Sequence, residues 1–141
     1  MPEPFVPICR VVRAGKEYTG KQGFHYLEGI SAETVGSRGV CMLLQTIPPR
    51  ARAKAHKHEH HETAIYVISG ESEMWYGDSL ERHVVVRTGE FLYIPAGVPH
   101  LPLNSTNEPV VAVVARTDPS EQESVVLLPE LEPLVPAPPR S

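Results

Sequence analysis

The sequence contains few of the features that mark secreted or membrane proteins. It has two cysteines, Cys9 and Cys41, which lie in separate apolar segments and form no Cys-x-x-Cys pair. No apolar run approaches the ~20 residues that a membrane span needs, and no basic start followed by an apolar stretch resembles a signal peptide. We therefore expect a cytoplasmic protein that does not bind a membrane and whose cysteines are reduced and buried.

Positive charge is also scarce. The chain has 13 lysines and arginines against 17 aspartates and glutamates, which gives a formal net charge of −4. Nucleic acids and anionic membranes are themselves negatively charged and do not attract a surface with this balance. We expect neither of them as a partner.

Sustained helical periodicity is absent, and the 15 prolines disfavour helix interiors. The chain has instead short apolar runs, rich in valine, isoleucine and tyrosine and bounded by turn residues, which are typical of β-strands. We expect strands at residues 6–13, 24–30, 40–47, 52–58, 63–69, 72–76, 81–87, 91–94, 100–104, 109–116 and 124–128. Many short strands separated by frequent turns favour a closed barrel or a sandwich.

One domain accounts for the whole length. The chain has no internal repeat, and 141 residues suffice for a single core. We expect a barrel over residues 1–128, with its motif-bearing core at 40–116, an irregular arm and loop at 17–39, and an extended proline-rich tail at 129–141. A single barrel leaves strand edges at its arms, and such edges pair readily with another chain. A homodimer formed by strand addition is therefore expected.

Four of the seven histidines lie within seven consecutive residues, His56-Lys57-His58-Glu59-His60-His61-Glu62. Residues two apart in a strand project to the same face, so His56 and His58 present two imidazoles side by side. Two imidazoles and a carboxylate suit Fe(II), Mn(II), Ni(II) or Zn(II) and leave open positions for substrate or water. The cluster predicts a metal site; the alternative is an exposed stretch that binds metal only weakly.

A second motif follows downstream, with the pattern Gly89-x5-Pro95-x-Gly97-x2-His100-x3-Asn104. Together with His56-x-His58-x3-Glu62 it resembles the two motifs of the cupin superfamily, and the second motif matches at every defining position. Residues 48–118 are similar to small bacterial one-barrel cupins that are often labelled as predicted mannose-6-phosphate isomerases. Fold-level similarity of this kind does not decide function.

The first motif departs from the family pattern in its spacing. Seven residues rather than six separate Glu62 from Gly70. When the strand is registered backwards from Gly70, Thr63 occupies the usual glutamate position, and a residue before it reaches inward only through a bulge. The sequence leaves open whether Glu62 or His61 completes the ligand set.

The resemblance implies an all-β, single jelly-roll barrel with one divalent metal ion near its mouth, with Zn, Mn, Fe and Ni as candidates. His56 and His58 would come from one strand and Glu62 from the start of the next. His100 would come from a strand that follows a bend at residues 95–99.

Strand alternation predicts which side chains share the cavity with the ion. We expect Tyr66 and Tyr93 there, along with Met42, Leu44, Ile68, Trp75 and Phe91. A buried phenol needs a partner and is able to orient a substrate, and a histidine is able to move a proton. His61, Tyr66 and Tyr93 are therefore the candidate catalytic residues, with Glu62 and His60 as further candidate bases. Arg52 and Lys54 share the strand and the face of His56 and His58. We expect both at the surface; the alternative is contact with an anionic substrate such as a phosphate or carboxylate.

Three functions remain open. The first is a metal-dependent enzyme acting on a small polar molecule, sugar-like or sugar-phosphate-like, by isomerase or epimerase chemistry; the family label favours this one. The second is a non-haem dioxygenase, which needs a redox-active ion with vacant sites. The third is a non-catalytic cupin that binds a small molecule or a metal.

Overall fold

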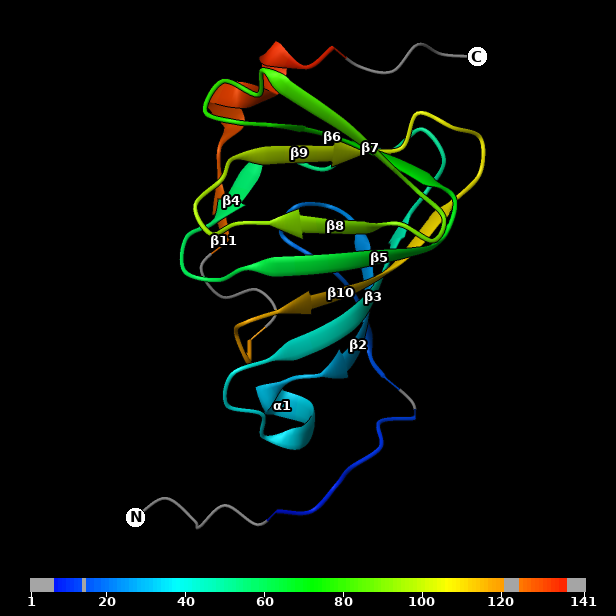
Figure 1. Cartoon of the computed structure of the whole chain (residues 1–141), viewed down its shortest axis with the longest axis vertical. Helices are drawn as coiled ribbons and strands as arrows, with labels where there is room; N and C mark the ends of the chain where they lie inside the picture. The colour runs from blue at the N-terminus through cyan, green and yellow to red at the C-terminus, as the bar shows by residue number, and fades with distance from the viewer. Residues whose placement is uncertain (1–6, 14, 121–124, 137–141) are drawn as a thin grey trace.

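The protein, described here from a computed structural model over residues 7–13, 15–120 and 125–136, consists of two antiparallel β-sheets that face each other (Figure 1). The six-stranded sheet has the order β1-β2-β3-β10-β5-β8 and comprises Glu17–Thr19, His25–Ile30, Cys41–Ile47, Val110–Arg116, Thr63–Ser69 and Phe91–Ile94. The five-stranded sheet has the order β11-β4-β9-β6-β7 and comprises Val125–Leu127, His56–His58, His100–Leu103, Glu71–Tyr76 and Arg82–Arg87. The all-β jelly-roll prediction is confirmed.

Alternation along the strands builds the core between the sheets. In β10, Val110, Ala112 and Val114 are buried while the residues between them are half-buried, and β3 alternates in the same way. The buried side chains of β2, β3, β5, β7 and β10 form one apolar cluster. Between the inner faces of the two sheets the packing leaves a small cavity.

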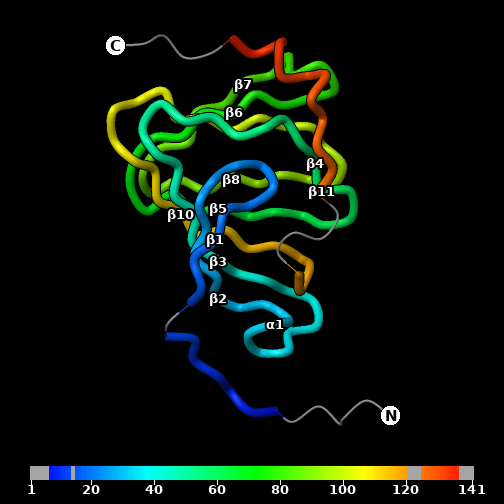
Figure 2. The backbone as a smooth tube through the Cα atoms, turned by 180° about the vertical axis from the view of Figure 1, so that it is seen from behind, coloured from blue at the N-terminus to red at the C-terminus, as the bar shows by residue number. Residues whose placement is uncertain are grey.

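Residues 17–39 are more ordered than we expected from their glycines. They form the β1–β2 hairpin and a single helical turn, α1 (Ala32–Val35), and the hairpin extends the six-stranded sheet beside β3 (Figure 2). Phe24 and Tyr26 from this segment are buried in the core. The apolar and aromatic residues therefore decided the structure of this segment, and the glycines only shape its turns.

The proline-rich tail also differs from the expectation. Pro129–Leu134 forms a 3-10 helix, η1, and Val135 beyond it is buried against Leu80, Leu101 and Leu103. Arg52, expected at the surface, donates hydrogen bonds to the carbonyls of Glu132 and Val135 at 3.0 and 2.7 Å. Proline fits the start of a helix, where no amide donor is needed, so residues 129–135 pack on the barrel instead of extending. Residues 137–141 of the predicted tail lie outside the described residues.

The arm before β1 is not part of either sheet. Residues 7–13 carry no regular secondary structure and run away from the barrel, so the predicted strand at 6–13 is absent over the described part of that range (Figure 1). Cys9 on this arm is exposed, contrary to expectation, whereas Cys41 is buried, and the two cysteines do not form a disulfide. No helix in the described part of the chain is long and apolar enough to cross a membrane.

Candidate metal centre

Three histidines from two neighbouring strands converge inside the barrel. His56 and His58 lie in β4, and His56 pairs directly with His100 in β9. All three side chains are buried, and one ligand nitrogen from each lies within 4.8 Å of the others. Two-residue spacing places His56 and His58 on one face, and cross-strand pairing adds His100, which lies more than forty residues further along the chain.

Backbone carbonyls orient two of the three rings. Nδ1 of His56 donates to the carbonyl of Lys54 at 2.7 Å, and Nδ1 of His100 donates to the carbonyl of Val98 at 2.9 Å. A carbonyl only accepts, so each of these nitrogens carries the proton and Nε2 keeps its lone pair. This arrangement is usual for metal-binding histidines, because it fixes both the tautomer and the direction of the ring.

The bend at residues 95–99 holds His100 in position. The amide of Gly97 donates to the carbonyl of His58 at 2.7 Å, and the carbonyl of Pro99 accepts from the amide of Gly77 at 3.0 Å. Gly97 has a φ of 80°, a left-handed conformation that favours glycine. The glycine of the second motif therefore ties the bend directly to the strand that carries the histidine pair.

The three histidines open onto a cavity of about 40 Å³ in the barrel interior. This is room for about three water molecules. Much of the wall is apolar and comes from both sheets, including Ile65, Val67, Met74, Val86, Leu92 and Val110. Its polar part is formed by the histidines themselves and by Gln22, Tyr26, Gln45, Thr63, Ser72 and Arg116.

Burial lowers the pKa of each of the three histidines, because the low-polarity interior disfavours the charged imidazolium. The pKa of His100 falls to about 4, with burial as the main cause and the positive charge of Arg116 as a further one. Burial also lowers the pKa of His58 strongly, again reinforced by Arg116. All three rings are therefore neutral at pH 7, which is the form that binds a metal ion.

Glu62, expected as a ligand, lies outside this cluster. Strand β5 begins at Thr63, whose side chain points inward, so the residue before it points outward. The carboxylate of Glu62 is exposed and accepts a hydrogen bond from the hydroxyl of Tyr93 at 2.5 Å. The seven-residue spacing to Gly70 thus has the effect of placing Thr63, and not Glu62, on the inner face.

The same alternation places both candidate tyrosines on the outer face of the six-stranded sheet. Tyr66 is 37% exposed and packs on Phe91, and Tyr93 is 59% exposed. Neither lines the cavity, and neither do the other residues that we expected there, Met42, Leu44, Ile68, Trp75 and Phe91. In each of these strands the inward set is shifted by one residue from the expected one, as Leu43, Val67, Met74 and Leu92 show.

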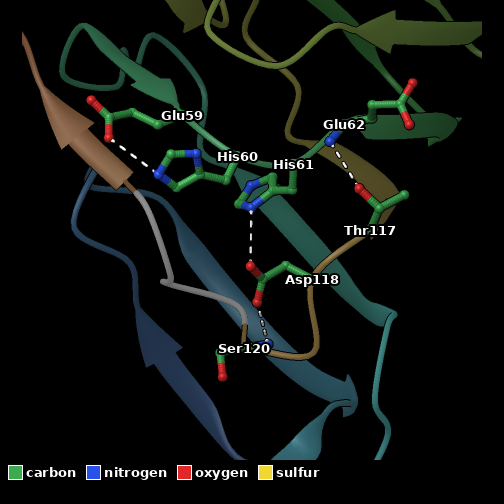
Figure 3. A network of polar contacts seen from close by, with 7 residues as sticks. All are labelled: Glu59, His60, His61, Glu62, Thr117, Asp118 and Ser120. Carbon is green, nitrogen blue, oxygen red and sulfur yellow. Dashed lines mark hydrogen bonds and ion pairs between the residues drawn. The ribbon is translucent and has the colours of Figure 1, made fainter.

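His61 is buried beside the cluster without lining the cavity. Its ring centroid lies 4.5 Å from that of His58, and its Nδ1 faces a carboxylate oxygen of Asp118 at 3.7 Å (Figure 3). Asp118 is held in turn by the amide of Ser120 at 2.8 Å. Figure 3 also shows the Glu62 carboxylate turned away from the His61 ring, while His60 contacts Glu59 at the surface. His61 is thus the only base candidate that is buried next to the histidines.

Several residues of the cavity wall were not predicted from the sequence. Arg116 occupies the inward phase of β10, in register with the buried valines, and Gln45 does the same in β3. A charged or amide residue in phase with the apolar face of a strand is the signal that identifies both of them. Gln22 comes from the turn that precedes Phe24, and no local pattern indicated that this turn reaches the barrel interior.

The residues present fit a divalent metal ion. Three neutral imidazole nitrogens suit Zn, Fe, Ni or Cu, and three protein ligands leave coordination positions open. Nδ1 of His58 is buried and has no hydrogen-bond partner among the described residues, so this nitrogen is satisfied only when a further group binds there. Sites with three protein ligands and an open position are generally catalytic, whereas structural zinc sites have four.

Two facing antiparallel sheets with a buried three-histidine cluster between them define the protein as a jelly roll with a candidate metal centre. A family model described as the Cupin domain matches residues 43–116, which is 74 of the 141 residues. The chain belongs to the cupin family. No curated protein sequence matches it.

Solved structures support the same fold. The polyketide cyclase RemF from Streptomyces resistomycificus is 22% identical, with a TM-score of 0.69 and 86% of each chain covered. Oxalate decarboxylase from Bacillus subtilis is 22% identical with a TM-score of 0.66; the match covers 82% of this chain but 30% of that one. A putative sugar phosphate isomerase from Acidithiobacillus ferrooxidans is 22% identical with a TM-score of 0.58, covering 74% of this chain and 67% of that one. At this identity the likeness shows the fold and leaves the activity open.

Proposed function

We propose that the protein is an enzyme that binds one divalent metal ion through His56, His58 and His100 and acts on a small polar molecule. The convergence of three buried, neutral imidazoles on an open cavity carries this proposal. A bound ion would supply Lewis acidity to a carbonyl or hydroxyl oxygen of the substrate. Bacillus subtilis oxalate decarboxylase, which shares the fold, contains Mn(II) centres, and this supports a metal ion here without identifying it.

The reaction that we favour is of the isomerase or epimerase type. Such a reaction moves a proton next to a polarised carbonyl, so a base is needed close to the ion. His61 is the base candidate that lies next to the cluster, with Asp118 facing its ring. The cavity of about 40 Å³ admits the reacting end of a sugar-like molecule and excludes most water from it. Tyr66 and Tyr93 lie on the outer face and take no part in this scheme.

The metal site is tested by the metal content of purified protein and single-histidine variants. The wild type should hold about one equivalent of a divalent ion after dialysis, whereas His58→Ala and His100→Ala should hold far less. His60→Ala is the matched control, because His60 belongs to the same histidine run but is exposed. If His58→Ala and His100→Ala retain the wild-type metal content, the ligand assignment is wrong.

The isomerase scheme is tested separately, with a panel of sugars and sugar phosphates and the protein loaded with Zn, Mn, Fe or Ni in turn. Turnover that is lost in His100→Ala and retained in His60→Ala supports the scheme. Absence of turnover with every ion and every substrate removes the reason for preferring it.

A dioxygenase is the second candidate, and the apolar wall of the cavity is the observation that favours it. Val67, Met74 and Val86 line the same cavity as the histidines, and an apolar wall of this kind accommodates a small apolar gas. Oxygen uptake by the Fe(II)-loaded protein with diketones or flavonols tests this candidate. A metal-loaded protein that shows neither oxygen uptake nor isomerisation is a non-catalytic binding cupin.

We also propose a homodimer in which the arm at residues 7–13 adds to the barrel of a second copy. The arm runs away from its own barrel, and Ile8 and Val11 on it are 62% and 72% exposed. Extended apolar segments of this kind pair readily with a sheet edge. Light scattering should give the dimer mass for the full chain and the monomer mass after removal of residues 1–13. A monomer mass for the full chain rules the dimer out.

A further inference from the structure

The turn between β1 and β2 brings a buried glutamine to the cavity. Gln22 is 1% exposed and lines the cavity that the three histidines open onto. Two hydrogen bonds of 3.0 Å close the turn, from the amide of Gly23 to the carbonyl of Gly20 and from the amide of Gly20 to the carbonyl of Phe24. A Cβ at Gly20 would overlap the ring of Tyr26 and lie 2.8 Å from Oε1 of Gln22, so only glycine fits beside this amide.

A single residue positions both this turn and one histidine of the cluster. The amide of Lys54 donates to the carbonyl of Gln22 at 2.7 Å, and the carbonyl of Lys54 accepts from Nδ1 of His56 at 2.7 Å. Gln22 is therefore joined through its backbone to the segment that orients His56. The backbone of Gln22 is thus fixed beside the histidine cluster without the use of its side chain.

Two polar side chains of the cavity wall have no hydrogen-bond partner among the described residues. Both polar atoms of the Gln22 amide and the hydroxyl of Thr63 are buried in this way. By contrast, the amide of Gln45, which lines the same cavity, donates to the hydroxyl of Tyr26 at 3.3 Å. Buried polar atoms normally have partners, so the atoms of Gln22 and Thr63 indicate that a polar ligand completes them.

The unpartnered atoms define what this ligand must offer. An amide oxygen only accepts and an amide nitrogen only donates, whereas a threonine hydroxyl does both. A ligand that satisfies Gln22 must therefore bring both a donor and an acceptor, and this holds for either orientation of the amide because both of its polar atoms lack a partner. A carboxylate or a bare carbonyl brings acceptors only. A hydroxyl next to a carbonyl brings both within the few heavy atoms that a space of about 40 Å³ holds.

We propose that the cavity binds the uncharged α-hydroxy-carbonyl end of its substrate, with the hydroxyl on Gln22 and Thr63 and the carbonyl towards the histidine cluster. This inference rests on the proposed function for the ion, and it assigns Gln22 as the residue that selects the substrate class. A carbonyl in this place is the group that a bound ion would polarise. A ligand without the hydroxyl leaves the buried amide unpaired, and the resulting loss of affinity is the physical basis of the selection.

Hydroxyacetone, butanone and glycolate are the matched probes, because they have the same number of non-hydrogen atoms in the same arrangement. Butanone lacks the hydroxyl, and glycolate carries a carboxylate in place of the methyl ketone. Their dissociation constants are measured by NMR titration of the Zn(II)-loaded and the metal-free protein. The side-chain amide signal of Gln22, assigned from its absence in Gln22→Met, reports contact with the probe.

Hydroxyacetone should bind at least about 10-fold more tightly than butanone and should shift the Gln22 signal. Equal binding of these two probes by the wild type overturns the proposal, and this comparison needs no variant to fold. In the metal-free protein no ion attracts an anion. Tighter binding of glycolate than of hydroxyacetone there overturns the assignment of an uncharged ligand.

The variants Gln22→Met and Thr63→Val remove the unpartnered groups and nearly keep the shapes of the side chains. Gln22→Met should weaken hydroxyacetone binding about 10-fold and leave butanone binding nearly unchanged, so that the preference for the hydroxyl is lost. Thr63→Val should cause a smaller loss in the same direction. Thr34→Val is the matched control, because the Thr34 hydroxyl lies in the cap of α1 and donates to the carbonyl of Gly29 at 2.8 Å. This control should bind both probes as the wild type does.

Stability gives a readout that separates ligand binding from a structural role. A side chain without a partner in the protein contributes no hydrogen bond to the fold, so Gln22→Met and Thr63→Val should keep or raise the urea midpoint of the ligand-free, metal-free protein. Thr34→Val, which removes a hydrogen bond, should lower the midpoint. A midpoint lowered by both cavity variants, or an undiminished preference for hydroxyacetone in Gln22→Met, overturns the proposal.

The metal content separates this inference from the proposed function. Hydroxyacetone binding that depends on Gln22 in a chain that takes up no ion refutes the metal site alone. Stoichiometric Zn(II) binding by a protein whose hydroxyacetone affinity is unaffected by Gln22→Met refutes the hydroxy-carbonyl site alone. Gln22→Met should retain the wild-type affinity for Zn(II); a large loss of this affinity would make Gln22 a metal ligand and overturn its role in substrate selection.

Discussion

Acidification should destabilise the metal-free protein strongly, because its histidines are buried in the neutral form. In the unfolded chain a histidine takes up a proton below about pH 6.5, whereas folded His100 does so only below a pKa of about 4. The folded state therefore binds fewer protons than the unfolded state in this window. Its stability must fall as the pH falls from about 6.5 towards 4.

The size of this effect follows from the pKa of His100. Each pH unit below the unfolded pKa costs about 1.4 kcal/mol, so moving from above pH 7 to pH 5 costs about 2 kcal/mol for this residue. Burial lowers the pKa of His56 and of His58 as well, and each contributes with the same sign and at most a similar size at pH 5. Losses of the same sign at three sites are a large fraction of the stability of a typical domain, which is about 5–15 kcal/mol.

Urea denaturation monitored by the fluorescence of Trp75 measures this dependence between pH 8 and pH 5 in the presence of a chelator. His100→Asn should reduce the loss of unfolding free energy over this range by about 2 kcal/mol, since asparagine does not titrate. His60→Ala, which removes an exposed histidine, should leave it unchanged. A stability that stays constant from pH 8 to pH 5 would show that the three histidines are not buried in the neutral form.

Three further predictions concern the packing of the barrel and use urea denaturation with matched variants. Phe24→Ala should lower the free energy of unfolding by about 3–5 kcal/mol, because Phe24 is 1% exposed. Phe91→Ala, at a site that is 80% exposed, should change it by less than about 0.5 kcal/mol. Similar losses in the two variants refute the core placement of the β1–β2 hairpin. Gly70→Ala should lower the free energy of unfolding more than Gly89→Ala does. Both glycines have positive φ, so backbone strain of about 1–2 kcal/mol is expected at Gly89, but a Cβ at Gly70 would in addition lie 2.6 Å from the Pro109 carbonyl oxygen, whereas at Gly89 it meets nothing within 4 Å. Equal losses of free energy contradict this contact. Asn104→Ala should cost about 1–3 kcal/mol, because its amide donates to the carbonyls of Ile47, Pro48 and Glu108, while the metal content stays at the wild-type level; loss of metal would indicate a role at the site.

The local patterns of the sequence were sufficient for the strands and for the histidine pair. Short runs of aliphatic and aromatic residues predicted β3, β5, β8 and β10 closely, because the apolar residues that must be buried are also those that fit a pleated surface. The spacing of His56 and His58 placed both on one face for the same geometric reason. The second motif predicted the bend at residues 95–99 and the strand that begins at His100, since glycine and proline restrict the backbone directly.

The phase of each strand could not be derived in this way. When a strand has apolar residues on both faces, its sequence does not show which face is buried, and a shift of one residue exchanges the inner and outer faces. Tyr66 and Tyr93 were therefore predicted inside although the pairing of β5 with β8 places both outside. The one-residue difference before Gly70 was the only local sign that Thr63, and not Glu62, points inward.

The sequence by itself determined the class of fold and the three imidazoles, because both depend on periodicity and on short motifs. Only the tertiary structure decided which other side chains meet these imidazoles. Arg116, Gln22 and Thr63 lie in three segments far apart in the chain and reach one cavity because β10 pairs with β5 and the turn before β2 closes over the barrel interior. Long-range pairing of this kind leaves no mark on local composition, so the set of side chains that lines the cavity follows from the fold and not from any motif.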